Sequence, residues 1–206
     1  GNYKIGAKDY LVLEACEYVE SFLHFNPYIS VITNVEEDHL DYFSGISHII
    51  SAFERFARLN SPDGCIIVCS DDKNAMTVVQ NIEKKVVKYG LISRNNDFFA
   101  ENAHFSASGK TEVDIFEHGK FAIKLELSVH GDHNVRNALG AYAAARTMGI
   151  DAEAAKRGLE AFGGTKRRFE TLGEVNGFTV IDDYAHHPQE LETVIKSLKA
   201  LYPQKR

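Results

Sequence analysis

The sequence contains no apolar stretch near the roughly 20 residues that a membrane span requires. Its start also lacks the basic and then apolar pattern that marks a secretory signal. Lysine and arginine number 23 against 29 for aspartate and glutamate, which gives a net charge of −6. An acidic balance disfavours nucleic acid as an electrostatic partner, although it does not exclude a nucleotide. We therefore expect a cytoplasmic protein with neither a membrane nor a nucleic-acid partner.

Cysteine is scarce, and internal repeats and low-complexity tracts are absent. The three cysteines lack the C-x-x-C spacing of a zinc site, and Cys65 and Cys69 flank the apolar run Ile66-Ile67-Val68. This pattern indicates reduced thiols in the core of a cytosolic protein. The remaining composition, 44% apolar and 25% charged, is ordinary for a globular chain. A length of 206 residues fits one large domain, or one domain and part of another.

The order of apolar patterns predicts an α/β fold. Short apolar runs and helical spacing alternate as strand 10–13, strand 28–33, helix 46–59, strand 65–69, helix 72–82 and strand 86–89. Such alternation is typical of a mainly parallel sheet with flanking helices. Residues 98–129 change to a period of two, with a hairpin that turns at His118-Gly119-Lys120. We expect this part to be a small antiparallel addition to the sheet.

Two helices are then predicted, at 134–148 and 152–162, followed by the linker candidate Gly163-Gly164-Thr165. Beyond the linker, a strand at Val180-Ile181 and a helix that opens at Pro188 begin a new strand–helix rhythm. The sequence therefore predicts a central domain over residues 1–164. Residues 165–206 would form a hinge and the start of a second, Rossmann-like α/β domain.

Four carboxylates and one histidine follow the strand predicted at 28–33, within residues 36–41. Open α/β sheets place their ligand chemistry at this end of a strand, although a solvated acidic turn is the alternative. Glu14 follows the strand predicted at 10–13 and could converge with His39. A carboxylate and one imidazole suit Mg²⁺ or Mn²⁺ better than structural zinc.

The run from Gly131 to Leu139 places two amides, Asn134 and Asn137, on one face of a helix start. Side-chain amides can both donate to and accept from a purine edge, and His133 stands beside them. Asparagine is also a good N-cap, so the alternative is that one of the two begins the helix.

Two further polar runs lie beyond the glycine linker. The cluster Lys166-Arg167-Arg168 suits a polyphosphate, with a solvated charge run as the alternative. The run from Asp182 to Pro188 packs two carboxylates and two histidines at a strand end, which folding alone does not explain. By contrast, Gly109-Lys110-Thr111 is predicted to be a turn, because the first glycine of a phosphate loop would fall on His104.

Taken together and in this order, these runs resemble the Mur ligase family, the ATP-dependent amino-acid ligases of bacterial peptidoglycan synthesis. The resemblance covers nearly the whole chain and rests on the runs 14–17 with 21–23, 33–41, 131–139, 166–170 and 182–188. It implies ATP and Mg²⁺, with Mn²⁺ as a substitute, and a place in cell-wall biogenesis, cell shape and cell division. The resemblance also implies site residues: Glu14 and His39 for the metal and catalysis; His133, Asn134, Asn137, Arg168, Asp183 and Tyr184 for ATP; Thr33 and Asn34 for the nucleotide sugar; and His186 for catalysis near the substrate carboxylate and the incoming amino acid.

The last two runs resemble the family members that attach L-alanine to UDP-N-acetylmuramate through an acyl phosphate. The alternatives are attachment of a whole tripeptide to the same nucleotide sugar, or a nucleotide-binding module without catalysis. The family's G-x-x-G-K-[ST] phosphate loop, its uridine-binding N-terminal domain and most of its C-terminal domain are not in this sequence. We therefore expect activity from the full-length enzyme and not from these residues alone. Some members carry a carbamylated lysine, and whether Glu54 takes its place here is open.

Overall fold

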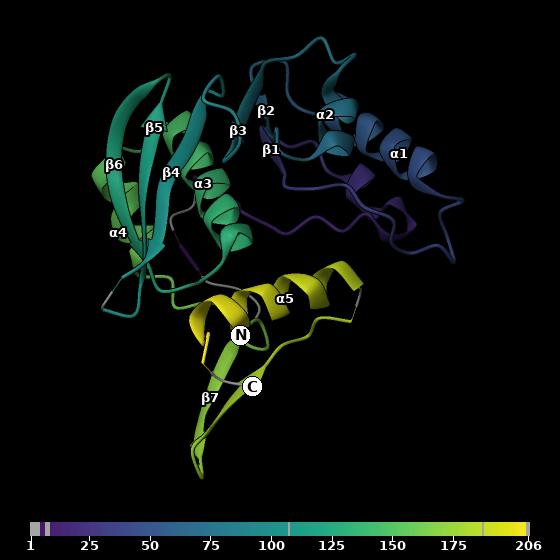
Figure 1. Ribbon diagram of the computed structural model, residues 1–206. Coiled ribbons are helices and arrows are strands. Elements are labelled where there is room, and N and C mark those ends of the chain that lie inside the picture. Colours follow the sequence, from purple (N-terminus) through teal and green to yellow (C-terminus); the bar gives the residue numbers. More distant parts are fainter. Residues whose placement is uncertain (1–4, 7–8, 107, 187, 205–206) are drawn as a thin grey trace.

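The computed structural model describes residues 5–6, 9–106, 108–186 and 188–204, and its main feature is one six-stranded sheet (Figure 1). The strands follow one another across the sheet in chain order: β1 (Ile29–Ile32), β2 (Cys65–Cys69), β3 (Val86–Gly90), β4 (Phe98–Phe105), β5 (Thr111–Glu117) and β6 (Lys120–Leu127). The first four strands pair in parallel, and β4, β5 and β6 pair antiparallel. The predicted α/β class with an antiparallel addition is confirmed. The addition continues the main sheet, because Tyr89 and Gly90 at the end of β3 pair with the start of β4.

Helices cover both faces of this sheet: α1 (Ile46–Arg58) and α2 (Lys73–Val79) on one, α3 (Asp132–Thr147) and α4 (Ala152–Glu160) on the other. The strand β2, between β1 and β3, is buried along its whole length, and every one of its residues is apolar or cysteine. Ile66 and Val68 point into the core beneath α1 and α2, whereas Cys65, Ile67 and Cys69 point into the core beneath α3 and α4. The predicted helices all form, although α2 and α4 end two or three residues early.

The strand predicted at residues 10–13 does not form. These side chains are largely exposed, between 43% for Leu13 and 94% for Val12. An apolar run becomes a strand when another strand pairs with it, and β1 pairs with β2 alone among the described residues. The segment instead runs irregularly to the kinked 3-10 helix η1 (Tyr18–His24), where Phe22 is buried against Phe56 with ring centroids 4.7 Å apart.

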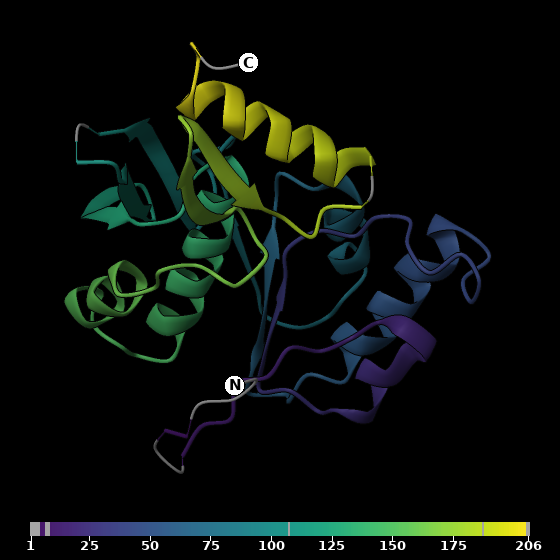
Figure 2. The same cartoon turned by 90° about the horizontal axis from the view of Figure 1, so that it is seen from below.

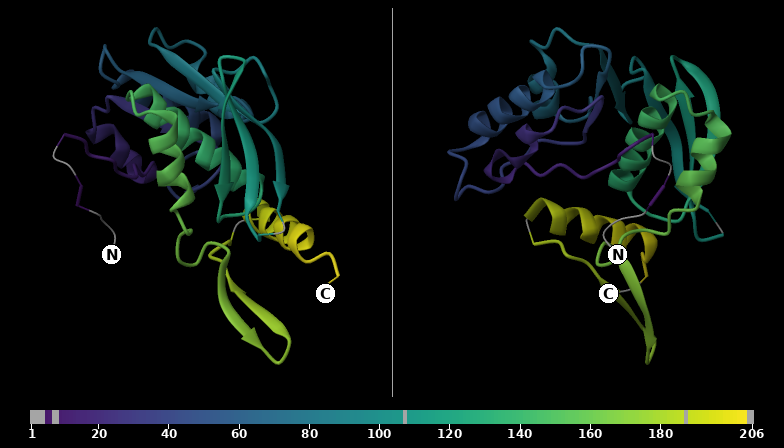
Figure 3. Two further views of the ribbon diagram at one scale, coloured as in Figure 1. Left: turned by 90° about the vertical axis from the view of Figure 1, so that its left-hand side faces the viewer. Right: turned by 180° about the vertical axis from the view of Figure 1, so that it is seen from behind.

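A second unit follows the linker and consists of β7 (Glu170–Val175), β8 (Phe178–Asp182) and α5 (Pro188–Leu201). The strand predicted at Val180-Ile181 and the helix predicted at Pro188 are confirmed. β7 is not predicted from the sequence, because nearly all of its residues are exposed. It pairs with β8 in an antiparallel hairpin, with a register shift between Thr171 and Gly173. The hairpin of β7 and β8 projects away from the main unit (Figure 3). The helix α5 instead lies across the main unit (Figure 2). None of the helices in the described residues has the length and apolarity needed to cross a bilayer.

A buried carboxylate ties the sheet to the start of α3. Asp71 follows β2, and its side chain is 5% exposed. It accepts hydrogen bonds from the backbone N–H groups of Leu91 (2.8 Å) and Ile92 (3.2 Å), which follow β3. It also accepts from Nε of Arg136, on α3, at 3.1 Å. A side chain at Gly90 would overlap this carboxylate, so glycine is required at the end of β3.

Close packing of α3 on the sheet generates a first prediction, at Gly140. A Cβ atom there would lie 2.9 Å from Cζ and from the hydroxyl of Tyr89, which is fully buried. Gly140→Ala should therefore destabilise the fold by about 1–3 kcal/mol, because the ring cannot move aside. The matched control is Gly158→Ala in α4, where a Cβ meets nothing within 4 Å and alanine should gain about 0.5–1 kcal/mol. Urea unfolding of both variants measures the difference. Equal effects of the two substitutions would contradict the close approach.

Candidate nucleotide and metal site

The loop after β1 holds His39 in a fixed position. Its backbone is left-handed, with φ of 52°, and its N–H donates to Oδ1 of Asp38 at 2.6 Å. The ring of Tyr18 lies against the imidazole, with centroids 4.5 Å apart. The hydroxyl of Tyr18 donates to Oδ2 of Asp41 at 3.0 Å, which closes the loop around the ring. A left-handed backbone costs free energy at a non-glycine residue and persists only where surrounding contacts offset that cost, as these contacts do here.

Two carboxylates face the His39 imidazole. Nε2 of His39 is 3.9 Å from Oε1 of Glu17 and 3.9 Å from Oδ2 of Asp38. One ligand atom of each residue lies within 4.8 Å of the others. Two carboxylates and one imidazole suit Mg²⁺ or Mn²⁺, so the donor set fits the divalent cation that the sequence predicts. The predicted partner Glu14 is exposed and lies three residues before Glu17 in an irregular segment. Its role as a ligand stays a prediction.

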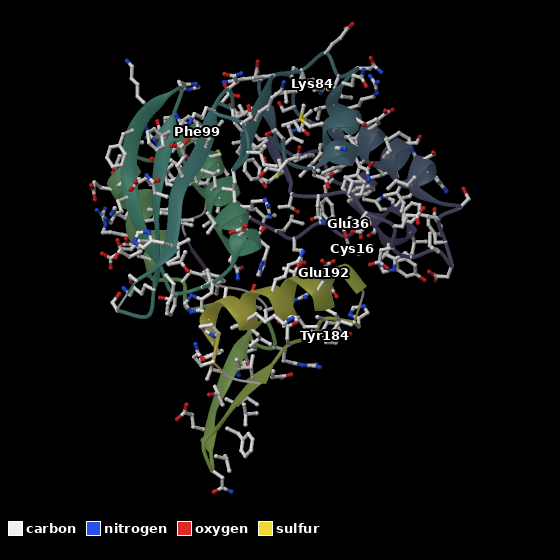
Figure 4. The ribbon with its side chains drawn as sticks, in the orientation of Figure 1. Cys16, Glu36, Lys84, Phe99, Tyr184 and Glu192 are labelled. Atoms are coloured by element: carbon white, nitrogen blue, oxygen red, sulfur yellow. The ribbon has the colours of Figure 1, made fainter. Side chains whose placement is uncertain are left out.

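The residues predicted for the nucleotide sugar lie at the same end of β1. Thr33 and Asn34 are exposed, and the Thr33 hydroxyl donates to Oδ1 of Asn34 at 3.0 Å. The next residue, Val35, is buried, and Asn74 of α2 donates to its carbonyl at 2.8 Å. This attachment fixes the start of the acidic loop, and Figure 4 shows Glu36 on the side of the main unit toward α5. Glu54 is half-buried on α1. The roles predicted for these residues stay predictions.

The start of α3 presents the predicted adenine group. The helix begins at Asp132 with Gly131 as its N-cap, so neither asparagine is the cap. Asn134 is half-buried and donates to the carbonyl of His130 at 2.8 Å, while Asn137 is exposed. Within the described residues, Nδ1 of His133 is buried without a hydrogen-bond partner. An orphaned buried nitrogen beside two amides fits a ligand with a polar edge.

Burial lowers the pKa of His133, and the nearby Arg136 lowers it further. The imidazole is therefore neutral at physiological pH, with one nitrogen as donor and the other as acceptor. Asp183 opposes this shift of the pKa and Arg168 adds to it. The ring of His130, just before α3, lies 6.5 Å from the ring of Phe169 in the hinge, measured between centroids. A side chain at Gly131 would also meet Oγ of Ser197 on α5, at 2.7 Å. The structure thus brings the α3 residues and the hinge residues together.

Asp183 fastens the hinge to the segment after β8. Its Oδ2 accepts from the N–H of Phe169 and its Oδ1 from the N–H of Ala185, both at 2.7 Å. The N–H of Tyr184 in turn donates to the carbonyl of Arg167 at 2.8 Å. These bonds assign Asp183 a structural role, and its predicted contact with a nucleotide stays a prediction.

The exposed ring of Tyr184, on the second unit in Figure 4, lies close to the predicted residues Arg168 and His186. The guanidinium carbons of Arg167 and Arg168 lie 4.8 and 5.9 Å from its centroid, within the range of cation–π attraction. The imidazole of His186 lies 5.1 Å from the same ring. Glu190 on α5, which is not among the residues predicted from the sequence, contacts both Arg168 and His186. Its position four residues after His186 at a helix start was the available signal.

Comparison with known proteins matches each unit to one family. Residues 4–145 match the Mur ligase middle domain, and residues 167–206 match the Mur ligase glutamate ligase domain. The predicted boundary after residue 164 falls between these ranges and stays a prediction. Across all of its 206 residues, the chain is 45% identical to the UDP-N-acetylmuramate–L-alanine ligase of Caldanaerobacter subterraneus.

Solved structures agree with the sequence comparison. The UDP-N-acetylmuramate-alanine ligase of Thermotoga maritima superposes with a TM-score of 0.75 at 28% identity, over 90% of this chain and 41% of that one. The murein peptide ligase of Psychrobacter arcticus gives 0.63 at 29% identity, over 90% and 38%. The chain spans 44% of the length of the C. subterraneus relative. Because the middle-domain match alone covers more than half of the sequence, the chain belongs to the Mur ligase family, as the resemblance predicts.

Proposed function

We propose that this chain carries the ATP-handling part of a ligase that joins L-alanine to UDP-N-acetylmuramate in the cytoplasm. The observation that carries the proposal is the contact between the start of α3, which holds His133 and two amides, and the second unit. The ring of Phe169, next to Arg168, lies 6.5 Å from that of His130, and Nδ1 of His133 is buried without a partner among the described residues. The identity of 45% to the UDP-N-acetylmuramate–L-alanine ligase of C. subterraneus supports L-alanine as the amino acid. The likeness to a murein peptide ligase keeps a peptide as the second candidate.

The proposed reaction has two steps. An oxygen of the substrate carboxylate attacks the γ-phosphorus of ATP, and ADP leaves as the acyl phosphate forms. The amine nitrogen then attacks the acyl carbon, the C–O bond to phosphate breaks, and the nitrogen gives up a proton. Both steps bring anions together, so positioning and electrostatic stabilisation supply most of the rate enhancement.

Different residues of this chain would bind the purine, the phosphates and the acceptor substrates. His133, Asn134 and Asn137 would bind the purine edge, since a neutral imidazole and amides offer both donors and acceptors. Arg168 would bind phosphate oxygens, and His186, beside it on the second unit, would meet the substrate carboxylate and the amine. The aromatic ring of Tyr184 would keep the side chains of Arg168 and His186 in place by its contacts with them. The second unit would therefore complete a site that the first unit begins, and closure of the two would exclude water from an acyl phosphate.

A divalent cation would lie at His39, held with Glu14 as the family resemblance implies, and with Glu17 and Asp38 as the observed neighbours of the imidazole. Bound there, the cation would neutralise charge on the phosphate oxygens. Thr33 and Asn34, at the same end of β1, would face the nucleotide sugar.

The metal assignment can be tested in the complete gene product. His39→Ala should weaken Mn²⁺ binding, measured by electron paramagnetic resonance, and should lower kcat about 100-fold at limiting Mg²⁺. Glu14→Gln and Glu17→Gln identify which carboxylate shares the cation with His39. The control is Glu83→Gln, an exposed carboxylate on the loop before β3. Unchanged Mn²⁺ affinity and turnover in all three site variants would favour the solvated acidic turn.

The nucleotide assignment predicts a division between substrates. Arg168→Ala and Asn137→Ala should raise KM for ATP about tenfold, because each removes a contact to the nucleotide. His186→Ala should instead raise KM for the amine, measured with L-alanine and with the tripeptide in turn. Steady-state kinetics with each substrate varied separately provide the measurement. If neither KM changes in any of the three variants, these side chains do not belong to the site.

A further inference from the structure

Glu190 lies in the first turn of α5 and contacts the side chains of Arg168 and His186. In the proposed function, these two side chains bind different substrates. Its Oε1 accepts a hydrogen bond from Nη1 of Arg168 at 3.3 Å. Its Oε2 accepts from the backbone N–H of His186 at 3.0 Å and lies 3.5 Å from Nδ1 of the same residue. One carboxylate thus spans the phosphate-binding and amine-binding groups with one oxygen for each.

We propose that Glu190 is a positioning residue that holds Arg168 and His186 in one arrangement, so that the ATP side and the amine side of the site are set together. The inference rests on the proposed function of those two residues. Glu190 need not touch either substrate, since it acts through the side chains on its two oxygens.

The bond to Glu190 leaves Arg168 able to bind a phosphate. A guanidinium has five N–H donors, and the bond to Glu190 uses Nη1. The Arg168 side chain is 53% exposed, whereas that of Glu190 is 33% exposed. The carboxylate therefore restrains the arginine from the protein side while part of the guanidinium faces solvent. Restraint before binding reduces the conformational entropy that a flexible side chain loses when it binds.

The alternative is that Glu190 serves the helix alone. A glutamate in the first turn commonly accepts from a backbone N–H just before its helix, as Glu190 does from His186. A helix cap affects stability, whereas a positioning residue affects the Michaelis constants of its neighbours' substrates. Glu192 supplies the control on the same helix, because it forms an (i, i+4) pair with Lys196 at 2.7 Å on the exposed surface.

The test is steady-state kinetics of Glu190→Gln, Glu190→Ala, Glu192→Gln and Arg168→Ala in the complete gene product. Glutamine keeps an acceptor oxygen for the N–H of His186 but loses the charge that holds Arg168. Glu190→Gln should therefore raise KM for ATP roughly fivefold, the scale of a partly exposed ion pair, with KM for the amine changed less than about twofold. Glu190→Ala should raise both constants, and Glu192→Gln neither.

The double variant Arg168→Ala/Glu190→Gln decides whether the effect passes through Arg168. It should show the same KM for ATP as Arg168→Ala alone, because the carboxylate then has no arginine to hold. An effect of Glu190→Gln that persists in the absence of Arg168 would overturn the proposal.

Two other outcomes separate the inference from the function on which it rests. If Arg168→Ala raises KM for ATP but both Glu190 variants behave like Glu192→Gln, Glu190 has no positioning role and the proposed function stands. A lower melting temperature with unchanged Michaelis constants would likewise reduce Glu190 to a helix cap. If Arg168→Ala itself leaves KM for ATP unchanged, the nucleotide assignment fails first.

Discussion

The buried carboxylate of Asp71 is the constraint on which the position of α3, and with it the proposed nucleotide site, depends. An ionised group taken out of water costs several kcal/mol unless charges and hydrogen bonds compensate it. Two backbone N–H groups beyond β3 and the Arg136 guanidinium supply that compensation. Since Arg136 lies in the first turns of α3, the rotation of the helix about its axis is fixed relative to the sheet. The direction in which Asn137 and His133 point follows from that rotation.

Most of the fold could be predicted from the sequence, because the burial of each element leaves a local pattern. β2 was predicted to the residue, since a strand buried on both faces must be apolar throughout. Residues 10–13 are also apolar throughout but form no strand, because pairing depends on a neighbouring strand that a local pattern cannot specify. β7 could not be predicted for the opposite reason: it forms a strand, but nearly all of its residues are exposed, so its sequence carries no alternation of buried and exposed side chains.

The candidate site could likewise be predicted only in part from the sequence. Runs of histidine, asparagine and carboxylate at strand ends identify His39, His133 and His186 as residues that folding alone does not require. The contacts between elements could not be predicted, because they depend on how distant segments pack. Glu17 beside His39 and Glu190 between Arg168 and His186 are both of this kind. The sequence therefore predicts which side chains are candidates for binding or catalysis, and the structure adds which side chains contact them.

The position of β1 at the end of the sheet has a consequence for how this chain behaves with its neighbours. Its outer row of backbone N–H and C=O groups pairs with no other strand of the described residues, and Val31 is 41% exposed beside it. An open, apolar strand edge is a template on which any extended segment of suitable length can add. An extended segment of the same polypeptide or of another molecule can therefore add to the sheet beside β1, next to the acidic loop that follows this strand.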